Sequence, residues 1–153
     1  MTPSIEIRRI TADEVAELRA VVQRYWLQLM PHAPVVTDHQ MGERYFAERF
    51  DFERSGRHFW WAMAAGAKVG FAFVELDESL EGVGAQIGDF YIERAYQRQG
   101  YGTAFIRALI AWLKVEGVYR IDLNVRQDNP GALAFWKSVG FELALYVVRQ
   151  YPD

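Results

Sequence analysis

The chain contains a strand-like run that passes through a glycine-containing turn directly into a helix, and this stretch constrains its fold most. It reads DFYIERAYQRQGYGTAF, from Asp89 to Phe105. After Gly102, apolar residues recur every three or four positions, which predicts a helix that ends at the C-cap glycine Gly117. A helix N-terminus presents free backbone N–H groups and the positive end of the helix dipole. The turn is therefore a candidate phosphate-binding site.

Two common phosphate-binding loops do not fit this turn. The nucleoside-triphosphate loop needs a Lys between its second glycine and the following Ser or Thr, whereas Thr103 follows Gly102 directly. The dinucleotide fingerprint needs three glycines, and only Gly100 and Gly102 are present. Two interpretations stay open: a pyrophosphate cradle to which Arg98 adds charge, or a tight turn whose glycines bind nothing.

The periodicity of the remaining sequence predicts a single α/β domain over residues 1–153. The predicted strands are 5–10, two strands within 58–76 joined by a hairpin turn at 65–68, 86–92, 119–125 and 141–150. The predicted helices are 11–30, 38–53, 103–116 and a short one between 129 and 140. Thr11 and Glu14 form a capping-box pattern, and Asn129 before Pro130 is a good N-cap. Residues 77–84 are interpreted as a polar loop.

Charge and composition exclude several classes of function. The net charge is −3, so neither nucleic acid nor an anionic membrane is an expected partner, and a cationic substrate fits better. The chain contains no Cys, which excludes disulfides, thiol nucleophiles and thiolate metal sites. It shows neither a signal-peptide pattern nor an apolar run of 18 residues. We therefore expect a cytoplasmic protein.

The glycine turn is accompanied by a second pattern downstream. Gln97-x-x-Gly100-x-Gly102 follows the strand, and Asn129-x-x-Ala132 leads into the run FWKSVGF. Together these motifs, over about 87–141, resemble those of the GCN5-related N-acetyltransferase superfamily. The resemblance implies a mixed, mostly antiparallel central sheet of six to seven strands. It further implies that the sheet is splayed between its fourth and fifth strands and flanked by about four helices.

The resemblance also implies acetyl-CoA as the cofactor, bound in the gap between the two splayed strands. In this superfamily, backbone N–H groups at the end of the first of these strands hold the pantetheine arm and polarise the thioester. The turn then holds the pyrophosphate. The cofactor-binding residues that it implies here are Phe90, Tyr91, Ile92, Gln97, Arg98, Gln99, Gly100, Tyr101, Gly102, Thr103, Asn129 and Trp136.

The acid and base positions depart from the pattern of the superfamily. Trp136 stands where many members have a Tyr that protonates the leaving thiolate, and an indole N–H is too weak an acid for this role. Asn124 and Gln86 stand at positions that are acidic in other members. The leading catalytic candidates are Asp89 and Tyr91. Three interpretations of Asp89 stay open: a base, a substrate anchor or merely a solvent-facing residue. Glu75 and Tyr146 are further catalytic candidates.

The expected acceptor is a primary amine, with a small molecule favoured over a protein N-terminus or lysine because the protein-type acid and base positions are missing. The substrate-binding residues that we expect are Tyr25, Trp26, His32 and Asn124, beside acidic residues of the 77–84 loop. His32 and His39 lack a third ligand at close spacing, so no metal site is expected. A non-catalytic acyl-CoA-binding module and a protein or peptide N-acetyltransferase stay open as alternatives.

The residues after the last predicted helix suggest a contact between subunits. Only about twelve residues follow Phe141, whereas many members of the superfamily have two strands there. A missing strand would leave a sheet edge that a second copy can cover. A homodimer is therefore a possible partner arrangement.

Overall fold

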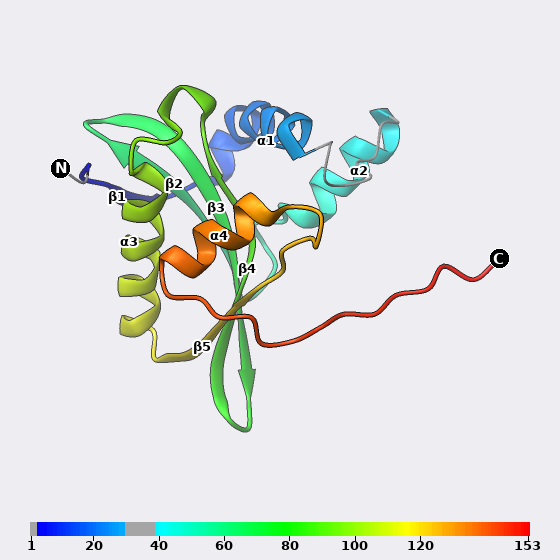
Figure 1. The fold of residues 1–153 in the computed structure, drawn as a ribbon. Helices are drawn as coiled ribbons and strands as arrows, with labels where there is room; N and C mark the ends of the chain where they lie inside the picture. The colour runs from blue at the N-terminus through cyan, green and yellow to red at the C-terminus, as the bar shows by residue number, and fades with distance from the viewer. Residues whose placement is uncertain (1–2, 30–38) are drawn as a thin grey trace.

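The computed structural model describes residues 3–29 and 39–153, which form one sheet with helices on both faces (Figure 1). The strands are β1 (Glu6–Arg9), β2 (Arg57–Ala64), β3 (Ala67–Ser79), β4 (Gly82–Ile92) and β5 (Val118–Leu123), in the order β1-β2-β3-β4-β5. The first four strands are antiparallel to their neighbours, and β5 runs parallel to β4. The predicted mixed, mostly antiparallel sheet is confirmed.

Four α-helices of the described residues flank the sheet, as predicted. They are α1 (Val15–Leu29), α2 (His39–Arg49), α3 (Tyr101–Val115) and α4 (Pro130–Ser138), with short 3-10 helices η1 (Ala12–Glu14) and η2 (Arg94–Tyr96). The capping box at Thr11 and the Asn129 cap of α4 are both present. In the described part of the chain, no helix is long and apolar enough to cross a bilayer.

The sheet has five strands among the described residues rather than the six to seven that were expected. Residues 141–153 pair with no strand, and Figure 1 shows this segment leading away from the sheet. Its apolar side chains are exposed, such as Leu145 and Val148. Strand-like composition alone does not make a strand, which also needs backbone hydrogen bonds to a neighbouring strand. The outer edge of β5 has no partner strand in the described residues, so a second copy at this edge stays a prediction.

The interpretation of residues 77–84 as a loop is wrong. β3 and β4 continue through this segment as a two-stranded ribbon that projects beyond the sheet (Figure 1), with Asp77 opposite Gly84 and Ser79 opposite Gly82. The Ser79 hydroxyl closes the turn by donating to the Gly82 carbonyl at 3.2 Å. A projecting ribbon leaves its acidic side chains in water on both faces, so polar composition did not exclude strands here.

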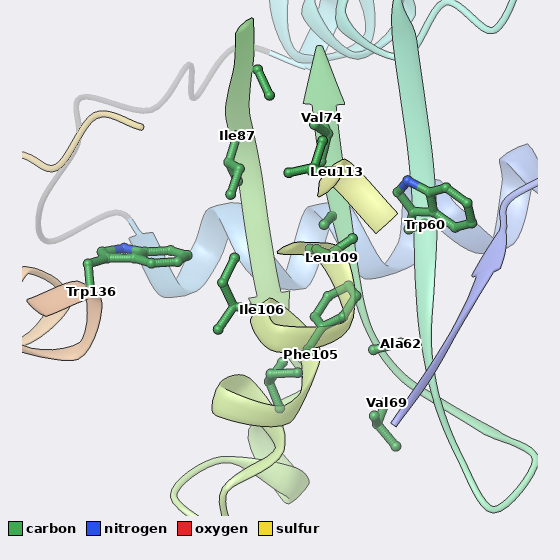
Figure 2. Packing of buried hydrophobic residues seen from close by; sticks show 13 residues of the cluster. Trp60, Ala62, Val69, Val74, Ile87, Phe105, Ile106, Leu109, Leu113 and Trp136 are labelled. Atoms are coloured by element: carbon green, nitrogen blue, oxygen red, sulfur yellow. The ribbon is translucent and has the colours of Figure 1, made fainter. Parts of the chain in front are cut away.

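Alternating strand residues supply two separate cores, one on each face of the sheet. Figure 2 shows the core on the α3 side, where Phe105, Leu109 and Leu113 of α3 lie against Val74 and other sheet residues. The opposite face packs against α1 and α2. The core of that face consists of Ile10, Leu18, Val21, Val22, Phe46, Phe50, Phe59, Trp61, Phe71, Phe73 and Tyr91. β4 is buried between both layers, which holds the strand that carries the candidate site in place.

Glu14 links the start of α1 to the sheet through ion pairs, and we expect these pairs to make the stability of the fold depend on pH. Its carboxylate accepts from Lys68 Nζ at 2.7 Å and from Arg8 at 2.9 Å. The hydrogen bond from Lys68 is the main cause that lowers the pKa of Glu14 from 4.5 to about 2. Since the folded pKa lies below the unfolded one, this stabilisation is complete above pH 4.5 and is lost as the pH falls towards 2.

We expect urea titrations from pH 7 to pH 2 to show this loss. The variant Glu14→Gln should be less stable than the wild type at pH 7, and the difference should shrink below pH 4.5. A difference that is the same at pH 7 and at pH 2 would contradict the assignment.

Candidate active site

The two central strands separate halfway along β4. Pairing between β4 and β5 begins at Val83 with Val118 and ends at Ile87 with Leu123. Beyond Ile87, β4 continues to Ile92 and pairs only with β3. The predicted splay between the fourth and fifth strands is thus present, and the edge of β4 from residue 88 to 92 is open on the side of β5.

A bulge and the strand alternation decide which backbone groups point into the gap. Gly88 has no partner in β3, because the register passes from Ile87 directly to Asp89. Further on, the Glu93 N–H donates to the Val69 carbonyl at 2.8 Å, so alternate residues of β4 bond to β3. By this alternation the backbone groups of Phe90 and Ile92 point to the open edge.

Tyr91, by contrast, is directed away from the gap. Its backbone pairs with Phe71 of β3, and its buried ring lies 5.3 Å from the ring of Tyr25 in the core beneath α1. Burial raises the pKa of Tyr91. The ring therefore packs and stays protonated at neutral pH.

The turn after β4 leads into α3 and leaves an array of backbone N–H groups free at the start of this helix. Arg98 and Gly100 both adopt left-handed backbone, with φ of +59° and +89°. The first helical bond of α3 runs from the Ala104 N–H to the Gly100 carbonyl at 3.1 Å. The N–H groups of the first α3 residues, 101–103, have no acceptor within the helix. Such an array at a helix N-terminus fits an anion, and a positive φ at the non-glycine Arg98 is an unusual feature that often accompanies function.

The two glycines of the turn serve different purposes. Gly100 has positive φ, and a Cβ there would also lie 2.9 Å from Pro3 Cδ. Gly102 is helical, and a Cβ there would lie 3.3 Å from the ring of Phe135 in α4. Gly102 thus lets α4 approach α3, while Gly100 shapes the turn that precedes α3.

The start of the turn is held from two sides. Gln97 Nε2 donates to the Ile92 carbonyl at 2.8 Å, and its amide exchanges hydrogen bonds with Gln28 of α1 at 3.1 Å. Arg24 of α1 makes a two-pronged ion pair with Glu93, at 2.9 and 3.2 Å. The side chain of Gln97 therefore positions the turn relative to the end of β4.

The remaining residues that were expected to bind the cofactor surround this turn or the gap. Gln99 is exposed and donates to the Ala95 carbonyl at 3.0 Å, and Tyr101 packs edge-on against Tyr96. Asn129 Oδ1 accepts from the Ala132 N–H at 3.1 Å, so its capping role is confirmed. Trp136 is buried, with its ring 5.0 Å from the ring of Phe90. It packs α4 against β4 just below the open edge.

Asp89 is buried on the α2 side of the sheet, where it is only 6% exposed. Its Oδ2 accepts from Arg49 Nε at 2.6 Å, and Arg49 Nη2 also donates to the Gly88 carbonyl at 2.9 Å. Burial raises the pKa of Asp89, and the guanidinium of Arg49 and the hydroxyl of Tyr25 oppose that rise. The carboxylate thus lies behind Arg49 and is positioned as an anchor rather than as an accessible base.

A cavity of about 550 Å³ opens where β4 and β5 separate. It is lined by Tyr45, Glu48, Arg49, Arg54, Arg57, Phe73, Glu75, Gln86, Ile87, Gly88 and Asn124. Asn124, expected to bind the substrate, and Glu75, a further catalytic candidate, come together there with Gln86, which stands at a position that is acidic in other members. The sequence did not predict four further lining residues, Glu48, Arg49, Arg54 and Arg57, because nothing in the local sequence marks which charged side chains face a cavity.

Other expected substrate residues lie elsewhere. Tyr25 is in the core next to Phe71, and Trp26 lies 5.4 Å from the ring of Tyr45 without lining the cavity itself. His32 lies outside the described residues. Within the described ranges, no three His, Cys, Asp or Glu side chains cluster in a way that could hold a metal ion.

Comparison with known proteins shows the family to which the chain belongs. Residues 18–141 match the model of the Acetyltransferase (GNAT) family. The [ribosomal protein bS18]-alanine N-acetyltransferase of Escherichia coli K12 is 35% identical over 111 residues, which cover 72% of the chain and 64% of that relative. The N-alpha-acetyltransferase RimI of Mycobacterium tuberculosis is 32% identical over 85 residues, 56% of the chain and 52% of the relative. The chain thus spans less than two thirds of the length of these relatives.

Solved structures share the fold at low sequence identity. A putative acetyltransferase, YycN, from Bacillus subtilis superposes with a TM-score of 0.79 at 16% identity, covering 98% of the chain and 99% of that structure. The aminoglycoside acetyltransferase meta-AAC0020, from an uncultured soil metagenomic sample and bound to sisomicin, has a TM-score of 0.72 at 17% identity. That alignment covers 97% of the chain and 95% of the structure.

Proposed function

Because the chain belongs to the acetyltransferase (GNAT) family, we propose that it is an enzyme that transfers the acetyl group of acetyl-CoA to a primary amine. The observation that carries this proposal is the open edge of β4 next to the left-handed turn at Arg98 and Gly100. A thioester arm and a pyrophosphate need these two features side by side. The buried, doubly packed β4 keeps them in a fixed relation.

The residues at the gap fit acetyl-CoA, which supplies an acetyl group activated as a thioester. The N–H groups of 98–103 would hold the pyrophosphate, since they converge at the N-terminus of α3. The backbone of Phe90 and Ile92 would hold the pantetheine arm and orient the thioester carbonyl. N–H groups fixed in a strand are preorganised for negative charge that develops on that oxygen.

The acceptor amine must lose a proton before it can react, because a free alkyl ammonium has a pKa near 10.4. Glu75 is a carboxylate that lines the cavity, directly opposite Gln86 in the β3–β4 register. Arg57 Nε lies 3.1 Å from a carboxylate oxygen of Glu75 and holds this side chain at the cavity. We assign to Glu75 the role of the general base that takes the proton from the amine. Asp89 has a positioning role, because it holds Arg49 in the cavity wall.

The size of the cavity favours a small-molecule acceptor. Its volume of about 550 Å³ lies within the range of small-molecule pockets, about 300–1,000 Å³. A protein N-terminus is the second candidate, because the relative from Escherichia coli carries the name of a ribosomal-protein alanine N-acetyltransferase.

The proposed activity can be measured as release of CoA thiol with a thiol-reactive dye. The chain contains no Cys, so the protein itself contributes no signal. We expect amine-dependent release with small amines that exceeds the release with peptides of free N-terminus. No release from any acceptor, with acetyl-CoA bound as shown by a thermal shift, would indicate the non-catalytic acyl-CoA-binding alternative.

The role of Gly100 provides a prediction with a matched control. We expect Gly100→Ala to weaken CoA binding about tenfold, because a Cβ at φ +89° costs about 1–2 kcal/mol and would press on Pro3. The control is Gly66→Ala, which has a similar φ of +82° in the β2–β3 turn and no heavy atom within 4 Å. Calorimetric titration with CoA measures both. If the two variants bound CoA with equal affinity, the turn at Gly100 would not contribute to CoA binding.

A further inference from the structure

The cavity at the gap carries more positive than negative charge. Three arginines line it, Arg49, Arg54 and Arg57, against two glutamates, Glu48 and Glu75. The chain as a whole has the opposite balance, with a net charge of −3. The excess of guanidinium groups is therefore specific to this cavity, and it differs from the acidic cleft that the sequence suggested for a cation.

Two of these arginines already bind partners within the chain. Arg49 binds Asp89 and the Gly88 carbonyl, and Arg57 binds Glu75. Arg57 Nη1 also donates to the last carbonyls of α2, those of Glu48 and Arg49, at 2.6 and 2.8 Å. Both guanidinium groups stack near the ring of Phe73, at 5.1 and 5.5 Å. Arg49 and Arg57 therefore form a fixed part of the cavity wall.

Arg54 is different, because its guanidinium has no hydrogen bond or ion pair among the described residues. Its backbone is nevertheless fixed, since its N–H donates to the Asp51 carbonyl and its carbonyl accepts from the Arg57 N–H. Arg54 thus places five unused donors at the cavity from an anchored turn. A planar guanidinium matches a carboxylate with two parallel hydrogen bonds.

We propose that the acceptor is an amine that also bears a carboxylate, of the amino-acid type, and that Arg54 binds this carboxylate while the amine lies near Glu75. The inference rests on the proposed function and names its substrate class. A polyamine has positive charge at both ends, so its second end would bring an ammonium group to Arg54 instead of an anion.

Matched acceptor pairs that differ only in the carboxylate test this inference. Lysine against cadaverine, ornithine against putrescine, and phenylalanine against phenethylamine would be titrated into the CoA-loaded protein by calorimetry, with thiol release measured in parallel. We expect the carboxylate member of each pair to bind at least about tenfold more tightly. Arg54→Gln should remove this preference and leave the affinity for the amine-only member unchanged. Arg107→Gln, an exposed position on α3, is the control that should keep it.

The outcomes separate the inference from the proposed function. Equal or tighter binding of the amine-only members, or a preference that survives in Arg54→Gln, overturns the carboxylate assignment even if acetyl transfer occurs. A carboxylate preference that depends on Arg54 supports the assignment even if no thiol is released. Absence of thiol release from every bound acceptor would count against the acetyltransferase reaction instead.

Discussion

Replacing Arg49 by Met should destabilise the protein by about 3–5 kcal/mol, the usual result of removing one partner of a buried ion pair. The substitution leaves the Asp89 carboxylate, only 6% exposed, without the guanidinium that lies 2.6 Å from it. Urea denaturation at pH 7 measures the loss.

A double variant distinguishes the unpaired charge from lost packing. Asp89→Asn combined with Arg49→Met should be more stable than Arg49→Met alone, because the charge has been removed together with its partner. The pH provides a second readout: burial raises the pKa of Asp89, so the Arg49→Met protein should regain stability as the pH falls and this carboxylate takes up a proton. A loss below about 1 kcal/mol, or a double variant no more stable than the single one, would show that the pair is not a stabilising element.

Replacing Glu75 by Gln should lower kcat at least about a hundredfold, the contribution expected of a general base. The side chain keeps its size and its place in the cavity but no longer accepts a proton from the ammonium. The affinity for acetyl-CoA should not change, since Glu75 lies on β3 and not at the open edge of β4. Initial rates of thiol release between pH 6 and pH 10 provide the measurement.

The pH profile separates a base from a merely structural residue. In the Glu75→Gln protein the rate should rise with pH up to the range where the amine deprotonates by itself, near 10. Glu48→Gln is the matched control, because Glu48 lines the same cavity from the end of α2. An equal loss in both variants, with an unchanged profile, would assign the effect to the charge of the cavity as a whole.

The part of the site that depends on local signals could be predicted from the sequence. Gly100 is required for the left-handed turn, and Asn129 with Pro130 fixes the start of α4. The splay follows from the family resemblance and is visible where β4 outruns its pairing with β5. In each of these cases a few neighbouring residues determine the geometry.

The part that depends on distant contacts could not be predicted. Arg49 and Asp89 are 40 residues apart, and no periodicity marks either as the partner of the other. Asp89 was a catalytic candidate from the sequence, but its environment depends on how α2 packs against β4. Likewise, polar composition at 77–84 did not show that the strands continue beyond the sheet, and apolar composition at 141–150 did not show whether this segment pairs with the sheet.

The location of the cofactor is the central claim, and backbone amide NMR during a titration with acetyl-CoA tests it most directly. The account predicts that shift changes concentrate on the amides of Phe90, Ile92 and residues 98–103, while the amides of the projecting ribbon, 77–84, stay unchanged. Absence of shifts at saturating acetyl-CoA, or shifts confined to elements away from the gap between β4 and β5, would contradict it.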